Sequence, residues 1–354
     1  MIAAGGTGGH IFPAVALARE IRARRPEAEI LFVGSRHGLE AKLVPQAGFP
    51  LDLVRASGFA GKSVASRLLA LAELPVGFLQ ARGLLAKLPA RAVAGVGGYV
   101  TVPVMAAARS LGVPTLIHES NAFPGVANRL LNRFATRTAV GIASANSHLA
   151  RPGVVTGTPV RPEFFSVPGL DPSASTRRLL VFGGSQGSRV LNKAMVEAVS
   201  FLAGDRLESI HQAGERLFED TRARYGGELP AGWKLVPFLT RIHEELAWAD
   251  LVLSRAGSQT LAELAAAGRP SILVPFGSAT HGHQTENAHV FAKAGASVAI
   301  EEAALSGETL AAVVKELLGD RRRLVEMGES ARSFARPDAA KLLADLLFEA
   351  EGTR

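Results

Sequence analysis

Two glycine-rich loops contain the residues whose types could do chemistry, and each loop joins a short apolar run to a helical pattern. The first loop is GGTGGH (residues 5–10) and the second is FGGSQGS (residues 182–188). Glycine permits positive φ angles and removes Cβ atoms that would block a ligand. The exposed N–H groups and the dipole of the following helix then favour an anion, usually a phosphate. The sequence therefore predicts two anion sites, although tight turns between strands and helices also use glycine for packing alone.

A histidine is present in only one of the two loops. His10 lies on the first turn of the helix predicted after the first loop, and an imidazole can accept a proton near neutral pH. His10 is therefore a candidate general base, with a packing or helix-capping role as the alternative. Glu119, at the tip of a strand predicted at 115–118, is a second candidate base, with a structural role as its alternative.

The spacing of the glycines argues against two common nucleotide sites. A dinucleotide fingerprint has the pattern G-x-G-x-x-G and an acidic residue about 20 positions later. Here the glycines stand at 5, 6, 8 and 9, the next predicted strand ends without an acidic residue, and the Walker lysine pattern is absent. The chain has no cysteine, which excludes thiolate ligands and disulfides, and no His, Asp or Glu residues show metal-ligand spacing. We therefore expect no cofactor and no metal.

Strand-like runs alternate with helical patterns along the chain. The predicted strands are residues 1–4, 30–33, 92–96, 115–118, 179–182, 208–212, 233–237, 251–254 and 271–274. Such alternation is typical of parallel sheets covered by helices on both faces. A chain of 354 residues is too long for one ordinary domain, and the segment 160–175, rich in Pro and Ser, is the natural linker. We predict an α/β protein with two Rossmann-like, doubly wound domains facing across a cleft, at residues 1–160 and 161–337, and a helix at about 338–354 that packs back on the first domain.

Basic residues are concentrated in the first part of the chain. Residues 1–160 carry a net charge of +10 and the remaining residues −3, so the first domain is expected to meet something anionic. Aromatic residues make up only 6% of the chain, which argues against a nucleic acid. An anionic membrane surface is the other candidate. No apolar stretch is long enough to span a bilayer and no signal peptide is recognisable, so we expect an intracellular protein.

One segment of the first domain has the composition of a membrane-surface segment. Residues 61–91 mix basic side chains such as Arg67, Arg82 and Lys87 with bulky apolar ones such as Leu74 and Phe78, as interfacial segments do. The alternative is a pair of amphipathic core helices, broken at the proline and glycine of the segment, with solvated basic faces.

Seven motifs identify a family. They occur in order as GGTGGHIFPAVALA (5–18), GVGGYVTVPVMAAA (95–108), HESNAFPGVANRLLNRFA (118–135), GTPVR (157–161), FGGSQGS (182–188), ADLVLSRAGSQTLAELAAAGRPSILVPF (249–276) and HQTENA (283–288). With these motifs the chain resembles the MurG family of bacterial peptidoglycan glycosyltransferases, in glycosyltransferase family 28. One departure is Ser120, where the family has glutamine.

The resemblance implies the GT-B architecture and an inverting reaction that needs no metal. The donor would be UDP-GlcNAc and the acceptor lipid I, which is undecaprenyl-diphospho-MurNAc-pentapeptide. GlcNAc would pass to the 4-hydroxyl of MurNAc, giving lipid II and UDP. The protein would lie on the cytoplasmic face of the inner (plasma) membrane as a peripheral protein, within a cell-wall synthesis complex. The alternative is another GT-B enzyme that uses a UDP-sugar, a glycolipid synthase or a UDP-GlcNAc 2-epimerase.

The resemblance also assigns roles to residues of both domains. In the second domain, the donor would contact Arg161, Ser185, Gln186, Leu239, Ser258, Gln259, Thr260, Glu263, Gln284 and Asn287. Among these, Ser185 would meet the diphosphate, Glu263 the ribose, and Gln284 with Asn287 the sugar. In the first domain, the residues implied are Thr7, Gly8, Gly9 and Asn121 for substrate binding, and His10 or Glu119 as the base.

Overall fold

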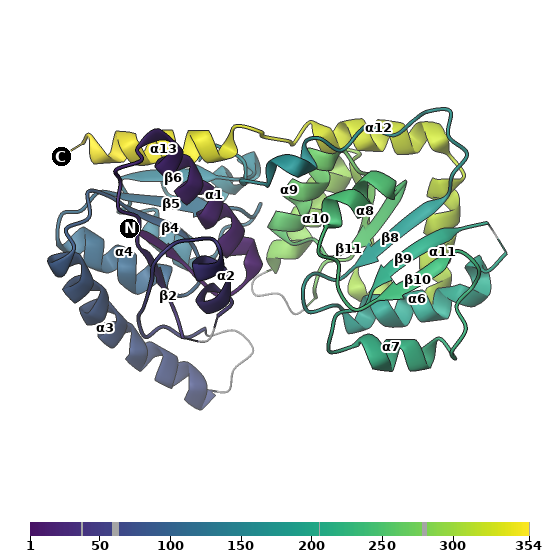
Figure 1. Ribbon diagram of the computed structural model, residues 1–354, viewed down its shortest axis with the longest axis horizontal. Helices are drawn as coiled ribbons and strands as arrows, with labels where there is room; N and C mark the ends of the chain where they lie inside the picture. The colour runs from purple at the N-terminus through teal and green to yellow at the C-terminus, as the bar shows by residue number, and fades with distance from the viewer. Residues whose placement is uncertain (37, 59–63, 205, 278–281, 354) are drawn as a thin grey trace. The chain divides into compact units, whose positions relative to one another are not determined.

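The chain forms two compact units (Figure 1). The computed structural model describes residues 1–36, 38–58, 64–204, 206–277 and 282–353, and it describes no side chains from 59 to 71. The first unit consists of Met1–Val160 and Arg336–Arg354, and the second of Arg161–Ala335. Each unit has its own parallel sheet and its own apolar core.

A parallel sheet of seven described strands forms the centre of the first unit, in the order β3-β2-β1-β4-β5-β6-β7. The order runs outward in both directions from the β1–β4 pair, and doubly wound sheets bind ligands beyond the carboxyl ends of the strands at such a switch point. The strands are β1 (Ile2–Ala4), β2 (Phe32–Gly34), β3 (Leu51–Leu53), β4 (Val93–Gly97), β5 (Thr115–Glu119), β6 (Arg137–Val140) and β7 (Val154–Val155).

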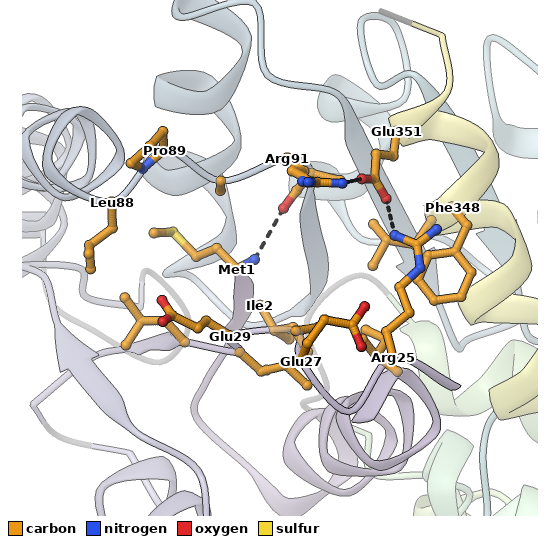
Figure 2. Close-up of a pocket in the computed structure, with 17 residues that line it drawn as sticks. Met1, Ile2, Arg25, Glu27, Glu29, Leu88, Pro89, Arg91, Phe348 and Glu351 are labelled. Atoms are coloured by element: carbon orange, nitrogen blue, oxygen red, sulfur yellow. Dashed lines mark hydrogen bonds and ion pairs between the residues drawn. The ribbon is translucent and has the colours of Figure 1, made fainter. Parts of the chain in front are cut away.

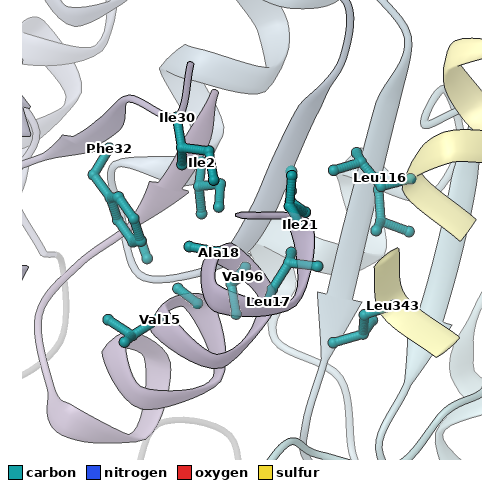
Figure 3. Close-up of a cluster of buried hydrophobic side chains, with 14 of the residues drawn as sticks. Ile2, Val15, Leu17, Ala18, Ile21, Ile30, Phe32, Val96, Leu116 and Leu343 are labelled. Carbon is teal, nitrogen blue, oxygen red and sulfur yellow. The ribbon is translucent and has the colours of Figure 1, made fainter. Parts of the chain in front are cut away.

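Helices cover this sheet with apolar faces. They are α1 (Gly8–Arg24), α2 (Glu40–Gln46), α3 (Val64–Lys87), α4 (Thr101–Ser110), α5 (Val126–Leu131) and α13 (Ala339–Glu351), with a short 3₁₀ turn, η1 (Ala143–His148). Helix α1 buries residues three and four positions apart, which form one face of a helix. Figure 3 shows Val15, Leu17, Ala18 and Ile21 of α1 turned toward the side chains of the strands.

The last helix of the chain belongs to the first unit. In Figure 1, α13 lies alongside α1, and it also contacts β5 and β6. Leu343 is fully buried in the same apolar cluster as α1 (Figure 3). Two ion pairs join the helices, Arg24 to Asp345 at 2.5 Å and Arg25 to Glu351 at 2.5 Å. The first unit is therefore discontinuous in sequence.

The second unit repeats the design with six described strands, in the order β10-β9-β8-β11-β12-β13 and a switch point between β8 and β11. Its strands are β8 (Arg178–Phe182), β9 (Glu208–Gln212), β10 (Trp233–Val236), β11 (Leu251–Ser254), β12 (Ser271–Leu273) and β13 (Ser297–Ala299). Its helices are α6 (Arg189–Leu202), α7 (Phe218–Arg224), α8 (Ile242–Trp248), α9 (Ser258–Ala267), α10 (His283–Lys293), α11 (Gly307–Leu318) and α12 (Arg321–Arg332), with 3₁₀ turns η2 (Pro162–Phe164) and η4 (Glu302–Ala304). The predicted pair of doubly wound parallel-sheet domains is confirmed.

Four short strands, β3, β6, β7 and β13, have no counterpart in the sequence prediction. They have two to four residues each, and β3, β7 and β13 lie at sheet edges. Edge strands need little apolar patterning because one side is not covered by a neighbouring strand. The residues of β7 are exposed, which explains the missing signal.

The described part of segment 61–91 differs from the alternative of two core helices. It contains one helix, α3, which passes through Pro75 without ending. Phe78 packs against the core of the first unit, so its predicted role as a membrane-facing group is corrected. Leu79, by contrast, is 65% exposed. Arg67 lies outside the residues whose side chains are described.

In the described part of the chain, no helix combines the length and the apolar character needed to cross a bilayer.

Candidate active site

A buried carboxylate holds the first glycine loop. Glu40, in the first turn of α2, is fully buried. Its Oε2 accepts the N–H of Gly6 at 2.9 Å, and its Oε1 accepts the N–H and the hydroxyl of Ser35 at 2.8 and 2.7 Å. A Cβ at Gly38 would collide with this carboxylate. Glu40 was not among the predicted site residues, and a glutamate opening the helix after the second strand is the signal that could have found it.

The loop itself presents backbone groups at the carboxyl end of β1. Thr7 is exposed and is the N-cap residue of α1, while Gly8 and Gly9 are partly exposed on its first turn. The first N–H groups of a helix have no partner within the helix and favour anions. The structure thus places Thr7, Gly8 and Gly9 together, as a site for an anion requires.

His10 is packed against the end of β4. Gly97 has a φ of 122°, and a Cβ there would collide with the His10 ring. The neighbouring Gly98 also has positive φ, and a Cβ there would collide with the backbone of Gly5. Gly97 and Gly98 therefore let the loops after β1 and β4 approach each other, and they set the position of the half-buried His10 ring.

A second histidine lies near His10. His118, at the end of β5, is buried, and its Nε2 lies 3.0 Å from the carbonyl of Gly157. Because its partner is an acceptor, Nε2 carries the hydrogen and Nδ1 has the lone pair. Burial lowers the pKa of His118, although the hydrogen bond to Gly157 and the charge of Glu119 favour the protonated form. His118 is therefore neutral at physiological pH.

Glu119 is fully engaged in its own loop. Its Oε1 accepts the backbone N–H and the side-chain amide of Asn121, both at 2.9 Å. Its Oε2 accepts the N–H of Gly125 and the amide of Asn128, both at 2.9 Å. A buried carboxylate with four donors has no lone pair left for a substrate proton. The four bonds favour a structural role for Glu119 over that of the alternative base, and one amide hydrogen of Asn121 is directed to Glu119.

The second glycine loop follows β8 and is open at its tip. Ser185 and Gln186 are exposed, and Ser188 caps α6 by accepting the N–H of Leu191 at 3.4 Å. Gly187 has positive φ, and a Cβ there would collide with the carbonyl of Ala213. The loop is therefore backed by the neighbouring strand end and presents Ser185 and Gln186 outward.

Helix α9 begins at the same edge of the sheet. Ser258, Gln259 and Thr260 form its first turn, and Gln259 Nε2 donates to Glu263 Oε1 at 3.2 Å. Burial raises the pKa of Glu263 to about 7, although the Gln259 donor and the charge of Arg161 favour the ionised form. A carboxyl group with this pKa at a helix start is typical of functional sites.

Two further predicted residues lie on loops of the second unit. Arg161 is exposed, and its guanidinium carbon lies 5.1 Å from the centre of the Phe164 ring. It acts electrostatically on Glu263, so these two residues are brought together. Leu239 is half-buried in the loop that follows β10.

The two residues predicted to bind the sugar differ. Gln284 Oε1 accepts the N–H of Phe276 at 3.0 Å, which leaves its amide nitrogen to serve as a donor. Asn287 is completely buried and donates to the carbonyl of Ala256 at 3.0 Å. The predicted sugar contact of Asn287 is therefore corrected: its side chain ties α10 to the loop before α9.

An arginine outside the predicted set lies on that same loop. Arg255 directly follows β11, and its guanidinium contacts the carbonyls of Val274 and Pro275 and the carboxylate of Glu302 at 3.2–3.5 Å. Its side chain is only 11% exposed. An arginine between a strand and the first turn of a helix is the sequence signal for a cation held at this edge.

One cavity of the first unit lies elsewhere. It has a volume of about 440 Å³ and is lined by the start of β1, the residues before β4 and the end of α13 (Figure 2). Arg25 and Arg91 both bond to Glu351 at its wall, at 2.5 and 3.1 Å. The cavity lies at the amino ends of the strands, opposite the glycine loop, and is not part of the candidate site. Among the described residues, no three His, Cys, Asp or Glu side chains gather as a metal site would require.

Comparisons with known proteins agree with both units. The model of the glycosyltransferase family 28 N-terminal domain matches residues 1–140, and that of the C-terminal domain matches residues 178–343. The chain is 42% identical over 352 residues to a protein of Methylococcus capsulatus, covering 99% of this chain and 98% of the relative. That relative is named UDP-N-acetylglucosamine–N-acetylmuramyl-(pentapeptide) pyrophosphoryl-undecaprenol N-acetylglucosamine transferase.

The chain belongs to glycosyltransferase family 28. Among solved structures, MurG of Acinetobacter baumannii is 31% identical, with a TM-score of 0.82 and 99% of each chain covered. A UDP-N-acetylglucosamine 2-epimerase, described as putative, from Listeria monocytogenes is only 14% identical, with a TM-score of 0.68 over 96% of this chain and 93% of that chain. At that identity the likeness shows the fold alone. This member of family 28 is a glycosyltransferase with the GT-B fold.

Proposed function

We propose that this glycosyltransferase transfers GlcNAc from UDP-GlcNAc to the 4-hydroxyl of MurNAc in undecaprenyl-diphospho-MurNAc-pentapeptide, with inversion, releasing UDP. The observation that carries the proposal is the 42% identity to the Methylococcus transferase, which extends over both units. The fold also supports it, because a glycine loop lies at the switch point of each of the two sheets.

The second unit is the proposed donor site. The diphosphate would lie over the loop at Ser185, where exposed backbone groups and the start of α6 favour an anion. The Glu263 carboxylate, one turn inside α9, would accept both ribose hydroxyls, and Leu239 would meet the base through its backbone. Arg161 would offset the charge of the leaving UDP, and the amide nitrogen of Gln284 would donate to a sugar hydroxyl.

The first unit is the proposed acceptor site. The N–H groups of Thr7, Gly8 and Gly9 would bind the acceptor diphosphate. His10 would take the proton of the attacking hydroxyl, because the other candidate base, Glu119, has its lone pairs occupied. Inversion requires only one displacement, so a single base is sufficient.

A transfer assay tests the proposal. Radiolabelled UDP-GlcNAc and a lipid I analogue should give a labelled lipid product and stoichiometric UDP. Free N-acetylmannosamine without labelled lipid would indicate an epimerase instead. Transfer to diacylglycerol or another simple lipid acceptor in place of the lipid I analogue would indicate a glycolipid synthase.

We also propose that the enzyme binds the cytoplasmic face of the membrane as a peripheral protein. The acceptor is a lipid with a diphosphate, so the first unit must work at a charged surface. Residues 1–160 carry a net charge of +10, and α3 exposes Leu79 and Val76 along its length and Lys87 at its end. Basic groups around exposed apolar ones are the pattern of surface binding.

A further inference from the structure

One buried side chain lies between two loops of the second unit. Gln212 is the last residue of β9, the strand between β8 and β10. The register places it level with Phe182, which ends β8, and with Val236, which ends β10. The loop that follows β8 is the glycine loop, and the loop that follows β10 leads to Leu239. Gln212 is only 3% exposed.

Its side-chain amide bonds to both loops. Nε2 lies 3.2 Å from the carbonyl oxygen of Gly184 and 3.4 Å from the carbonyl oxygen of Pro237. A glutamine amide has two hydrogens, so one is available for each carbonyl. The Gly184 carbonyl also accepts the N–H of Gly187 at 3.0 Å, which fixes it from a second side.

The direction of these carbonyls determines the direction of two N–H groups. In a trans peptide the C=O and the next N–H point in opposite directions, and the described peptide bonds are all trans. With the Gly184 carbonyl turned toward Gln212, the N–H of Ser185 points away from it. For the same reason the N–H of Phe238 points away from Gln212 in the other loop.

We propose that Gln212 is a positioning residue that turns the N–H groups of Ser185 and Phe238 outward together, so that one nucleoside diphosphate can be held at both ends. This inference rests on the proposed donor site and adds a residue that touches no ligand. The buried amide sets the orientation of the peptide at the phosphate end and of the peptide that leads to Leu239 at the base end.

His211, the residue before Gln212, is hydrogen-bonded on the opposite face of the same strand end. His211 Nε2 lies 3.0 Å from Asn192 Oδ1, and Asn192 Nδ2 donates to the Ala213 carbonyl at 3.0 Å. Because Asn192 donates through its nitrogen, its oxygen accepts from His211. Burial lowers the pKa of His211 to about 3, so this hydrogen-bond direction does not change with physiological pH. Gln212 is thus held on a rigid strand end.

Two substitutions separate positioning from general packing. Gln212→Met keeps the size but cannot donate, so both peptides lose their anchor. Gln212→Glu has a carboxylate that repels both carbonyls and attracts N–H groups, so both peptides should rotate. We expect UDP affinity to fall about tenfold in Gln212→Met, which corresponds to two modest neutral hydrogen bonds, and about threefold for uridine and for inorganic diphosphate measured singly. Gln212→Glu should bind all three ligands more weakly than Gln212→Met does. This includes uridine, although uridine carries no charge.

The control is Ser209→Ala on the same strand. Ser209 is buried and its hydroxyl has no hydrogen-bond partner among the described residues, so this variant should bind all three ligands as the wild type does. Crystal structures of the unliganded variants supply a readout that needs no nucleotide: in Gln212→Glu the 184–185 and 237–238 peptides should be rotated. Unchanged peptides, a UDP affinity within twofold of wild type in Gln212→Met, or loss for only one of the two fragments would overturn the inference. Rotated peptides in a protein whose wild type binds no UDP would instead overturn the proposed donor site.

Discussion

At the scale of single residues, the identity of the base depends on the surroundings of three side chains. Both carboxylate oxygens of Glu119 accept hydrogen bonds, from Asn121, Gly125 and Asn128. His118 donates through Nε2 and keeps a lone pair on Nδ1, but burial of this side chain lowers its pKa and makes it a weak base. His10, on the first turn of a helix beside the switch point, is the remaining candidate base of the first unit.

His10→Ala should slow the reaction and leave the donor site intact. A positioned base contributes about 10²–10⁴-fold, so kcat should fall by that factor while the Kd for UDP stays within twofold. Steady-state kinetics and a UDP titration measure the two quantities. A kcat within threefold of wild type would mean that another group accepts the proton.

Glu119→Gln should act on stability instead. A glutamine replaces one acceptor oxygen by an NH₂ group, which then faces the donors of Gly125 and Asn128 or those of Asn121. Because buried donors without acceptors cost about 1–3 kcal/mol each, we expect the free energy of unfolding to drop by roughly 2–4 kcal/mol. Urea unfolding followed by circular dichroism measures it. A lower kcat with an unchanged free energy of unfolding would instead indicate that Glu119 is the catalytic base.

Glu263 should make donor binding depend on pH. With its pKa raised to about 7 by burial, the carboxyl is largely protonated at pH 6 and ionised at pH 8. Only the ionised form accepts both ribose hydroxyls, so UDP affinity should rise across this range. In Glu263→Gln the affinity should be lower and nearly constant between pH 6 and 8, as measured by calorimetric titration.

The same group has an opposite effect on the stability of the unliganded protein. Its folded pKa lies above its unfolded value of 4.5, so its contribution to stability is complete below pH 4.5 and is lost as the pH rises through about 7. The loss is at most about 3 kcal/mol, at 1.36 kcal/mol per pKa unit. Wild type should therefore lose more stability than Glu263→Gln between pH 4.5 and 7.5, and parallel curves would contradict the assigned pKa.

At the scale of elements, a buried arginine joins two helices of the second unit. Arg269 is 1% exposed. Its Nε donates to the carbonyl of Leu246 at 2.5 Å, and its Nη atoms lie 3.3–3.5 Å from the carbonyls of Ala247, Ala267 and Gly268. These carbonyls lie at the ends of α8 and α9, where the last carbonyls of a helix lack partners and a cation is favoured.

Arg269→Met should therefore loosen α9 and, with it, the donor site. The buried carbonyls would lose their donor, so we expect a destabilisation of about 2–4 kcal/mol. Denaturant unfolding measures it, and Arg322→Met, at an exposed arginine on α12, is the control and should leave stability nearly unchanged. Equal stability of the two variants would show that α8 and α9 hold together without this arginine.

Helix α3 carries the membrane prediction. Arg67→Gln, Arg82→Gln and Lys87→Gln together should weaken binding to anionic vesicles by roughly 3 kcal/mol at low salt, and added salt should have the same effect on the wild type. Val76→Ser with Leu79→Ser should weaken binding in a way that survives high salt, because the lost contribution is apolar. The control is Phe201→Ser, an exposed apolar residue of the second unit. Co-sedimentation equal for all variants would exclude α3 as the docking element.

At the scale of the whole molecule, the chain returns to its first unit after completing the second. Helix α13 buries Leu343, Leu346 and Leu347 against α1 and the sheet. Because a buried leucine stabilises by about 1.5–3 kcal/mol, removing α13 should cost the first unit roughly 5 kcal/mol or more. A chain ending at Asp338 should therefore lose transferase activity while still binding UDP through the second unit. Loss of UDP binding as well would show that the second unit also needs α13.

The sequence by itself determined the features that depend on local pattern. The two glycine loops, the alternation of strand and helix and most strands of both sheets follow from residue types at short spacing, because backbone freedom and helix dipoles are local properties. His10, Ser185 and the α9 turn at Ser258 were predicted at the ends of the elements where they lie. Short edge strands such as β7 were not predicted, because two exposed residues show no periodic pattern of apolar side chains.

Only the tertiary structure decided which polar groups are already occupied. Glu119 and Asn287 have the residue types of ligand-binding groups, yet Glu119 is engaged by its own loop and α5, and Asn287 by the loop before α9. Glu40 and Gln212 look ordinary in sequence, yet their positions beneath glycine loops make them anchors. A hydrogen bond occupies a donor or a lone pair, however distant its partner is in the sequence. The partners of Glu40, Gln212 and Asn287 are up to 34 residues away along the chain. The availability of a side chain for chemistry is therefore a property of the folded unit.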